Sequence, residues 1–341
     1  MLRFIFCLTV TLTTTMALHE PANAASDDFF SGKTLRILVG FPPGGGFDTY
    51  ARTIARHMGK QIRGNPKVFV ENMPGAGSLI AANHLYRRAQ PDGLTMGHFI
   101  GGLVMGQVLG GPGIEFDAPK FEYVGVPTKD TSACALTKAS GIASMEKWLG
   151  SKTPVKLGGT IPGSTTDDHP KILAVALGLP VHIVSGYKGT PDIRLAAEGG
   201  EVAGGCWGWE SMKSTWSRAL QSGDVVVVVQ MVPKANPDLP NVPLAINFAK
   251  TEEARHLIQV GIHDMNLLLR TFALPPGTPK DRVQIIRRAF AQTMKDPEFL
   301  ADAKKSKLDV DPGSGEEVEK TVVNLFKVDP SLVAKLKEIL K

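Results

Sequence analysis

The chain has 341 residues, 43% of them hydrophobic, and carries 38 Lys and Arg against 33 Asp and Glu, a net charge of +5. This length is sufficient for two domains. The basic residues are scattered and form no stripe interleaved with aromatic residues, so the composition argues against a nucleic-acid-binding protein. Residues 1–24 have a basic start, an apolar stretch and small residues ending at Ala24, which predicts a signal peptide cleaved at about that point.

Cleavage there leaves 317 residues, which we expect to form a soluble periplasmic protein. No later segment holds about 18 unbroken apolar residues, the length that a membrane-spanning helix needs. Two cysteines remain, Cys134 and Cys206, and an oxidising compartment permits either a disulfide between them or two buried thiols. The cysteines and histidines form no cluster with metal-ligand spacing, so we expect no metal and no cofactor.

The first predicted element is a buried strand at 35–39, and helical spacing begins at about Asp48. Between them lies the glycine loop 44–46. Such a loop, leading into a helix, presents free backbone N–H groups and a positive helix end, both of which favour an anion. A dinucleotide fingerprint would need its third glycine at Thr49, and no Lys-Ser/Thr pair follows the loop, so we favour a carboxylate over a nucleotide. A loop that only connects strand to helix is the structural alternative.

A second loop of the same character follows the next predicted strand. The strand is 68–70, the loop 71–78 contains two glycines, and a helix is predicted over 79–89 before a third strand at 94–97. Alternating strands and helices predict parallel sheets with helices on both faces. Ligands bind such sheets at the carboxyl ends of the strands. We therefore expect the two glycine loops to meet there as half of a carboxylate-binding site.

The middle of the chain predicts a second domain. Residues 121–136 are extended and are predicted to cross into it, and strands follow at 155–157 and 181–184. The predicted strand at 225–229 would carry the chain back. Polar loops follow the predicted strand ends at 158–170, 186–190 and 204–211.

The C-terminal part predicts an extended segment at 267–274, an amphipathic helix at 281–294, and a helical tail over 316–341. We expect these segments to pack over the first domain. The expected division is a first lobe of residues 25–127 and 232–341, and a second lobe of residues 128–231.

The motifs, in this order, resemble the extracytoplasmic solute-binding proteins of tripartite tricarboxylate transporters, known as Bug proteins. The motifs are Phe41 to Gly46 with Asp48, Glu71-Asn72 with Pro74 to Gly77, Pro91-Asp92-Gly93, Tyr187-Lys188-Gly189, and Pro275 to Pro279. The resemblance implies an α/β fold: a periplasmic-binding-protein type II-like clamshell of two Rossmann-like lobes with a ligand cleft between them. It also implies two partners, a small carboxylate ligand and the membrane permease subunits of a tripartite transporter, for a protein that we expect to be a monomer.

The resemblance also implies which residues bind the ligand. In the family, the first two loops hold a carboxylate through backbone amides, hydroxyls and bridging waters, and the second lobe supplies the other jaw. Carried over to this chain, the first-lobe positions are Phe41, Gly45, Asp48, Ala76 and Ser78. The second-lobe positions are Thr160, Ser164, Thr165, Asp168, Lys188 and Trp207.

Three positions depart from the family pattern. Phe47 replaces a small polar residue, Ser78 replaces a glycine, and Trp207 stands where an acidic residue is common. Loss of that acid argues against amino-acid ligands, because an ammonium group would have no partner, and favours aromatic or apolar-chained acids over citrate. Structural roles remain open for Lys188 as a solvated loop residue and for Trp207 as a ring packed beneath a loop.

The sequence predicts no enzyme. Asp167-Asp168-His169 invites a catalytic interpretation, but adjacent acids at a helix start are more often caps, and no Gly-x-Ser-x-Gly elbow occurs. We expect a receptor that captures an organic acid, a di- or tricarboxylate or an aromatic carboxylate, by lobe closure and delivers it to the transporter. The alternatives are a ligand-sensing partner of a signalling receptor and an exported enzyme acting on a carboxylic acid.

Overall fold

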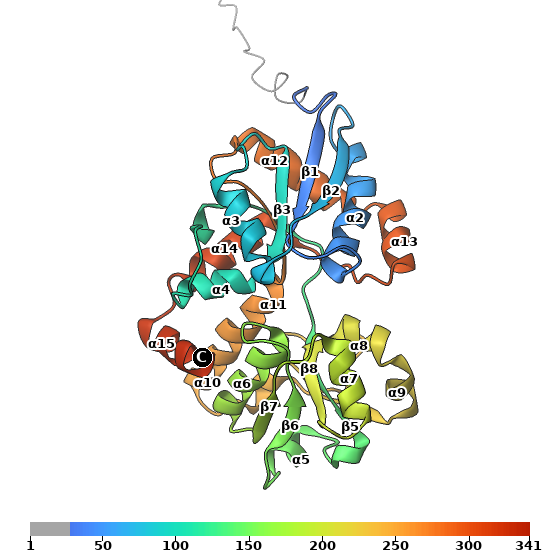
Figure 1. The fold of residues 1–341 in the computed structure, drawn as a ribbon, viewed down its shortest axis with the longest axis vertical. Helices are drawn as coiled ribbons and strands as arrows, with labels where there is room; N and C mark the ends of the chain where they lie inside the picture. Colours follow the sequence, from blue (N-terminus) through green and yellow to red (C-terminus); the bar gives the residue numbers. More distant parts are fainter. Residues whose placement is uncertain (1–27) are drawn as a thin grey trace, which may run out of the picture.

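The computed structural model describes residues 28–341, which form two α/β lobes, one above the other in Figure 1. The predicted signal peptide lies outside the described residues. Between residues 28 and 341, no helix combines the length and the apolar composition that crossing a membrane requires. Each lobe has its own sheet, so the predicted α/β class with two lobes is confirmed.

The first lobe is built on a six-stranded sheet in the order β11-β4-β10-β3-β1-β2. The strands are β1 Thr34–Val39, β2 Lys67–Asn72, β3 Thr95–Ile100, β4 Glu122–Val126, β10 Arg270–Leu274 and β11 Gly313–Ser314. The central strand β1 pairs in parallel with β2 and β3. Leu35, Ile37 and Val39 on one face of β1 and Leu38 on the other are fully buried, as the apolar run predicts for a strand covered on both faces.

The helices of the first lobe cover both faces of this sheet. They are α2 Gly46–Met58, α3 Leu79–Arg87, α4 Gly102–Val108, α11 Asp264–Leu268, α12 Lys280–Thr293, α13 Pro297–Lys305 and α14 Gly315–Leu325. In α2, Tyr50, Ile54 and Met58 recur every fourth residue and are fully buried. This spacing puts them on one face of the helix, against the apolar cluster of β1 and β10.

The second lobe has a five-stranded sheet in the order β7-β6-β8-β5-β9. The strands are β5 Ser132–Thr137, β6 Val155–Gly158, β7 Val181–Val184, β8 Gly204–Gly208 and β9 Val225–Gln230. Cys134 of β5 lies directly opposite Cys206 of β8, and the two form a disulfide. The choice that the sequence left open, between a disulfide and two thiols, is therefore settled by the register of these strands.

The helices of the second lobe are α5 Met145–Leu149, α6 Thr165–Leu177, α7 Thr190–Glu198, α8 Trp209–Thr215, α9 Ser217–Ser222 and α10 Glu252–Ile258. Helices α6, α7 and α8 each begin just after a strand of the sheet, on the side that faces the first lobe (Figure 1). In the first lobe, α2 and α3 likewise follow the ends of β1 and β2, so helix N-termini from both lobes face the space between them.

Both sheets are mixed, which differs from the parallel sheets expected. β1, β2 and β3 are parallel, as are β6, β7 and β8. β10 is antiparallel to β3 and β4, and β5 is antiparallel to β8 and β9. β5 and β10 each follow a segment that arrives from the other lobe. Because they start at the side of their sheet that faces the other lobe, they run in the opposite direction to the parallel strands beside them.

The chain passes between the lobes more than twice. Residues 127–131 connect β4 to β5. The return begins in α10, which contacts α6, continues through a π-helix at Gln259–His263 and ends in α11 before β10. Helix α15, Pro330–Ile339, then contacts α6 and α10, so it lies on the second lobe. From the sequence we expected this tail to pack over the first lobe. The lobe boundaries expected from the sequence stay a prediction.

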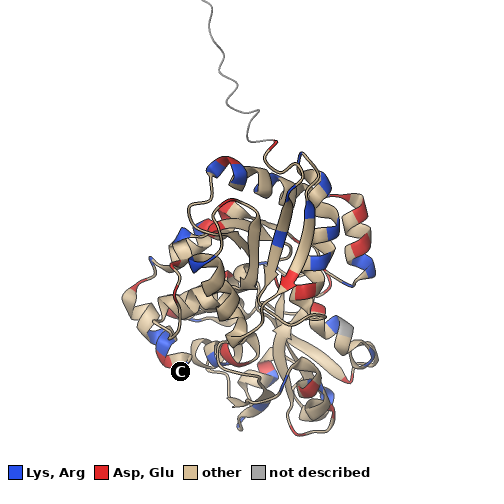
Figure 2. Ribbon diagram, turned by 45° about the horizontal axis from the view of Figure 1, so that its top comes forward, with Lys and Arg blue, Asp and Glu red and all other residues tan. Residues whose placement is uncertain are grey.

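Figure 2 shows Lys and Arg interspersed with Asp and Glu on both lobes. Many of these charges pair locally, as Arg194 does with Glu198 four residues later in α7. Exposed pairs of this kind contribute little to stability, roughly 0–1 kcal/mol. The charge pattern of the sequence is therefore reproduced on the surface as small mixed groups.

Candidate ligand-binding site

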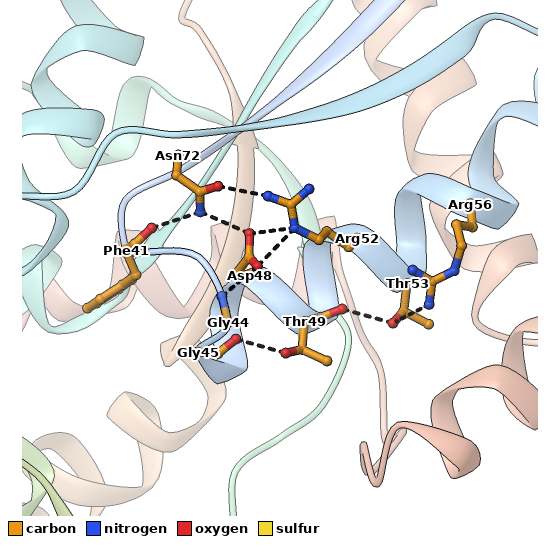
Figure 3. A network of polar contacts seen from close by, with 9 residues as sticks. All are labelled: Phe41, Gly44, Gly45, Asp48, Thr49, Arg52, Thr53, Arg56 and Asn72. Atoms are coloured by element: carbon orange, nitrogen blue, oxygen red, sulfur yellow. Dashed lines mark hydrogen bonds and ion pairs between the residues drawn. The ribbon is translucent and has the colours of Figure 1, made fainter.

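The loop between β1 and α2 is fixed by a buried carboxylate (Figure 3). Asp48 is 3% exposed and accepts hydrogen bonds from the Gly44 N–H at 2.8 Å, from Arg52 Nε at 2.9 Å and from Asn72 Nδ2 at 2.9 Å. Burial alone would raise the pKa of this carboxyl, but the hydrogen bonds from Arg52, Gly44 and Asn72 outweigh it and lower the pKa. Asp48 therefore stays ionised and shapes the loop.

Asn72 links this loop to the end of β2. Its amide nitrogen donates to the Phe41 carbonyl and to Asp48, both at 2.9 Å, while its oxygen accepts from Arg52. Phe41 is half-buried and Gly45 is exposed, so the backbone of the loop faces outward over this network. Two predicted site positions, Phe41 and Asp48, thus belong to one rigid assembly whose exposed surface includes Gly45.

The second loop contacts the first. Ser78 is fully buried, and its Oγ accepts a hydrogen bond from the Ile100 N–H at 3.0 Å. Gly40 lies so close to it that an added Cβ would stand 2.2 Å from the Ser78 Cβ. Ala76 and Ser78 have φ angles of 46° and 72°, a left-handed conformation that is uncommon outside glycine and that clusters at functional sites. The predicted meeting of these loops at the sheet edge is present.

Phe47, the first departure from the family pattern, belongs to a stack of rings at the same edge. It lies 4.2 Å from the Phe41 ring and 4.8 Å from His98, which in turn stacks on Phe272 at 3.9 Å. Burial lowers the pKa of His98 to about 3, so its ring is neutral, and Nδ1 donates to the Thr271 carbonyl at 3.0 Å. Phe47 therefore supports the loop as an apolar packing residue.

In the second lobe, a buried carboxylate holds the loop between β6 and α6 in the same way. Asp167 is fully buried and accepts from the Thr160 N–H at 2.6 Å, from Ser164 Oγ at 3.1 Å and from Ser185 Oγ. Thr160 Oγ1 also donates to Ser164 Oγ at 2.9 Å. The sequence assigned the neighbouring Asp168 to the ligand and missed Asp167, although both acids stand in the first turn of a helix, as Asp48 does.

Ser164, Thr165 and Asp168 line a cavity of about 150 Å³ between the lobes. The other wall comes from the first lobe, where Ile100 ends β3 and Met105 lies on α4. Asp168 accepts from the Gly163 N–H at 3.1 Å, and burial raises its pKa to about 6 despite this bond. Three of the predicted second-lobe residues are thus brought together at an interlobe surface.

Lys188 and Trp207 do not line this cavity. Lys188 is exposed and lines a separate hollow on the second lobe with Tyr187 and Glu201. Trp207 is 2% exposed, and its ring stacks on Trp216 at 5.2 Å inside the lobe. Lys188 is therefore a solvated loop residue and Trp207 a core residue, which are the structural roles that the sequence left open for them.

Arg270 is a residue at this cleft that the sequence did not single out. It begins β10, and its guanidinium lies over the rings of Tyr50 and Phe47, 4.6 and 5.2 Å from their centroids. Glu210 of α8, in the other lobe, lies 3.6 Å from it and 3.3 Å from the Tyr50 hydroxyl. A charged residue at the start of an otherwise apolar strand was the available signal.

Among residues 28–341, no group of three or more His, Cys, Asp or Glu side chains is arranged to hold a metal ion. His169, next to Asp168, is buried, and burial lowers its pKa to about 3. Its Nδ1 has no hydrogen-bond partner among the described residues. In the Asp167-Asp168-His169 motif, Asp167 therefore supports the loop, while Asp168 and His169 both line the interlobe cavity.

Comparison with known proteins gives a consistent family. The family described as "Tripartite tricarboxylate transporter family receptor" matches residues 50–337. A UPF0065 protein from the gbd 5' region of Cupriavidus necator is 26% identical over 299 residues, covering 86% of this chain and 83% of that protein.

Solved structures share the fold. A TctC solute-binding protein from Polaromonas, solved without ligand, is similar with a TM-score of 0.69 and 16% identity, over 89% of this chain and 98% of that one. An R. palustris protein solved with adipate is similar with a TM-score of 0.65 and 19% identity, over 90% and 97% of the two chains. At these identities the similarity establishes the two-lobed architecture.

Proposed function

The chain belongs to the tripartite tricarboxylate transporter receptor family, and we propose that it captures an organic acid between its lobes and delivers it to the membrane subunits of such a transporter. The matched family is described as a receptor and not as an enzyme, and we assign no catalytic group. We further propose that the protein works in the periplasm as a monomer, after removal of residues 1–24 as a signal peptide.

One observation carries the proposal of an interlobe ligand. Gly163, Ser164, Thr165 and Asp168 of the second lobe and Ile100, Gly102, Met105 and Gly106 of the first line the same cavity, next to the loop fixed by Asp167. The Ile100 N–H donates to Ser78 of the second glycine loop, which lies against Gly40 just before the loop fixed by Asp48. Since helices α2 and α6 begin at these loops, unpaired backbone N–H groups and positive helix ends point into the interlobe space. Such groups favour a carboxylate and reorganise little when it binds. The adipate held by the R. palustris relative supports this class of ligand.

Binding between lobes implies a mechanism of closure. A ligand that contacts both lobes is held more tightly by the closed arrangement, so it shifts the open–closed equilibrium toward closure. The crossings at 127–131 and at the π-helix 259–263 are the segments whose backbone would absorb the motion. π-helical turns of this kind are frequent at functional sites. The closed form is then the form that the transporter would recognise.

The test is thermal unfolding of residues 25–341 with adipate, succinate, citrate and benzoate, and with hexane-1,6-diol and adipamide as uncharged controls. A ligand present at 100 times its Kd should add about 2.7 kcal/mol to the free energy of unfolding. We expect at least one of the four acids, and neither control, to raise the Tm. The proposal would be contradicted if only the diol or adipamide raised the Tm, or if none of the four acids did.

A further inference from the structure

We propose that Arg270 is a ligand-binding residue. Its guanidinium contacts the carboxylate of the acid held at the α2 N-terminus, and this carboxylate takes the place of Glu210 beside the guanidinium. This inference rests on the proposed function and names a residue outside the two glycine loops. The cation adds charge recognition to a site otherwise made from backbone N–H groups, and it selects acids over neutral compounds of the same shape.

The position of Arg270 follows from the topology. It is the first residue of β10 and pairs with Ile100, the last residue of β3, so it stands at the sheet edge that faces the second lobe. A Cβ placed on Gly46 would lie 3.2 Å from one terminal guanidinium nitrogen and 3.5 Å from the other. The cation therefore borders the first turn of α2, where a carboxylate would meet the helix end.

The guanidinium is held without using its hydrogen-bond donors. The faces of Tyr50 and Phe47 lie 4.6 and 5.2 Å from it, within the range of cation–π attraction. Nε is buried with no partner, and no N–H of the group donates to another described residue. Five N–H donors on a side chain that is only 14% exposed are thus left for a planar acceptor.

Arg287 shows what a buried arginine with a structural role looks like in this protein. Its side chain is 10% exposed, and its three nitrogens donate to the Tyr123 carbonyl at 2.7 Å and to Glu316 and Glu319 at 2.9 Å each. Buried polar groups are normally satisfied in this manner, because an unmet donor is destabilising. The contrast singles out Arg270 as a cation that is positioned for a partner which binds and leaves.

Glu210 is the acid that such a ligand would replace. It comes from α8 of the second lobe, and its carboxylate stays 3.6 Å from Arg270, beyond the distance of about 2.7–2.9 Å that charge-assisted hydrogen bonds prefer. Its Oε2 lies 3.3 Å from the Tyr50 hydroxyl, which donates its proton over a shorter distance, 2.7 Å, to the Asp309 carbonyl. Glu210, together with the buried Asp130, thus neutralises the cation loosely and leaves the N–H groups of the guanidinium free for bidentate binding.

The experiment compares the acid affinities of five proteins: wild type, Arg270→Gln, Arg270→Lys, Glu210→Gln and Arg87→Gln. Arg87 is the matched control, since it is an exposed arginine on α3 that lies over the Tyr86 ring, 5.8 Å from its centroid. Adipate, succinate, citrate and benzoate are titrated by thermal shift and calorimetry, with adipamide as the neutral probe. Circular dichroism without ligand verifies that each variant is folded.

For every acid that stabilises the wild type, we expect Arg270→Gln to weaken binding by about tenfold or more. Arg270→Lys, which keeps the charge but loses the planar fork, should weaken it less, and Arg87→Gln should leave it unchanged. Glu210→Gln should tighten binding, because the competing acid is gone while the bond to Tyr50 can persist. If Arg270→Gln does not fold, the lysine variant decides.

Two failures are distinguishable. Wild-type affinity in folded Arg270→Gln or Arg270→Lys, with the acids still stabilising the wild type, overturns the role of Arg270 alone. No stabilisation of the wild type by any of the four acids overturns the proposed function and the role of Arg270 together. Weaker acid binding by Glu210→Gln would also contradict the exchange, since it would mean that Glu210 assists the ligand.

Discussion

Replacing Asp48 by alanine tests whether one buried carboxylate shapes the first half of the site. The change removes the acceptor of three hydrogen bonds, from Gly44, Arg52 and Asn72. A hydrogen bond to a charged group contributes about 1.5–3 kcal/mol. The low end of this range applies to the bond from the Gly44 N–H, since Gly44 is exposed, and to the bond from the Asn72 amide, which also donates to the Phe41 carbonyl. Arg52 is 45% exposed and can be rehydrated, so its ion pair adds only about 0.2–1 kcal/mol.

We therefore expect Asp48→Ala to lower the free energy of unfolding by about 3 kcal/mol and the Tm by roughly 4–5 °C. The measurement is thermal and urea unfolding followed by circular dichroism at pH 7. Asp329→Ala is the matched control, because Asp329 accepts from the Ser331 N–H at the N-cap of α15, on the surface. Loss of a cap of this kind costs about 1 kcal/mol.

The same variant should also lose stabilisation by the acid that stabilises the wild type, since the loop that presents the α2 N-terminus is no longer held by the bonds of Asp48 with Gly44 and Asn72. Asp329→Ala should retain that stabilisation in full. An Asp48→Ala protein that unfolds within about 1 kcal/mol of wild type and still responds to the acid would refute the view that Asp48 builds the site.

Gly45→Val and Ala76→Asp should abolish stabilisation by the acid while leaving the fold intact, because both residues are exposed on the loops and a Cβ at Gly45 meets nothing closer than 3.8 Å; unchanged thermal shifts in both would exclude the loops. Three buried histidines have lowered pKa values caused by burial, about 3 for His98 and His169 and about 4 for His263. The unfolded chain, with ordinary values near 6.5, binds protons first, so urea unfolding should show stability falling below pH 6.5 by up to about 1.4 kcal/mol per pH unit and histidine; a flat profile from pH 7 to 5 would contradict this. Reducing the disulfide between Cys134 and Cys206, which are 72 residues apart, should lower stability by about 4 kcal/mol in denaturation with and without reductant, and equal midpoints would argue against it.

Local patterns in the sequence predicted the elements that carry the loops. The apolar run of β1 and the glycines before α2 identify a strand-to-helix turn, and parallel pairing of β1 and β2 brings the second loop beside the first. The contact between Gly40 and Ser78 follows from that topology. These predictions succeed because they depend on neighbours in the chain and on one general rule about sheet edges.

Side-chain direction was harder to predict. Trp207 and Cys206 are adjacent in β8, so they point to opposite faces of the sheet, and only the packing against Trp216 decides which face receives the ring. Asp167 and Asp168 present the same problem in the first turn of α6. They are adjacent in the sequence, but the side chain of Asp167 supports the loop whereas that of Asp168 lines the cavity. Arg270 was missed because its place at the cleft depends on pairing with β3, far away in the sequence.

The placement of α15 on the second lobe has a consequence for how the two halves move. After α14 leaves the first lobe, residues 326–329 span to α15, where the backbone of Lys341 also accepts a bond from Lys171 of α6 at 3.2 Å. The lobes are therefore joined by three tethers instead of two. We expect this third connection to resist twisting of one lobe against the other, so that opening and closure follow mainly a hinge motion.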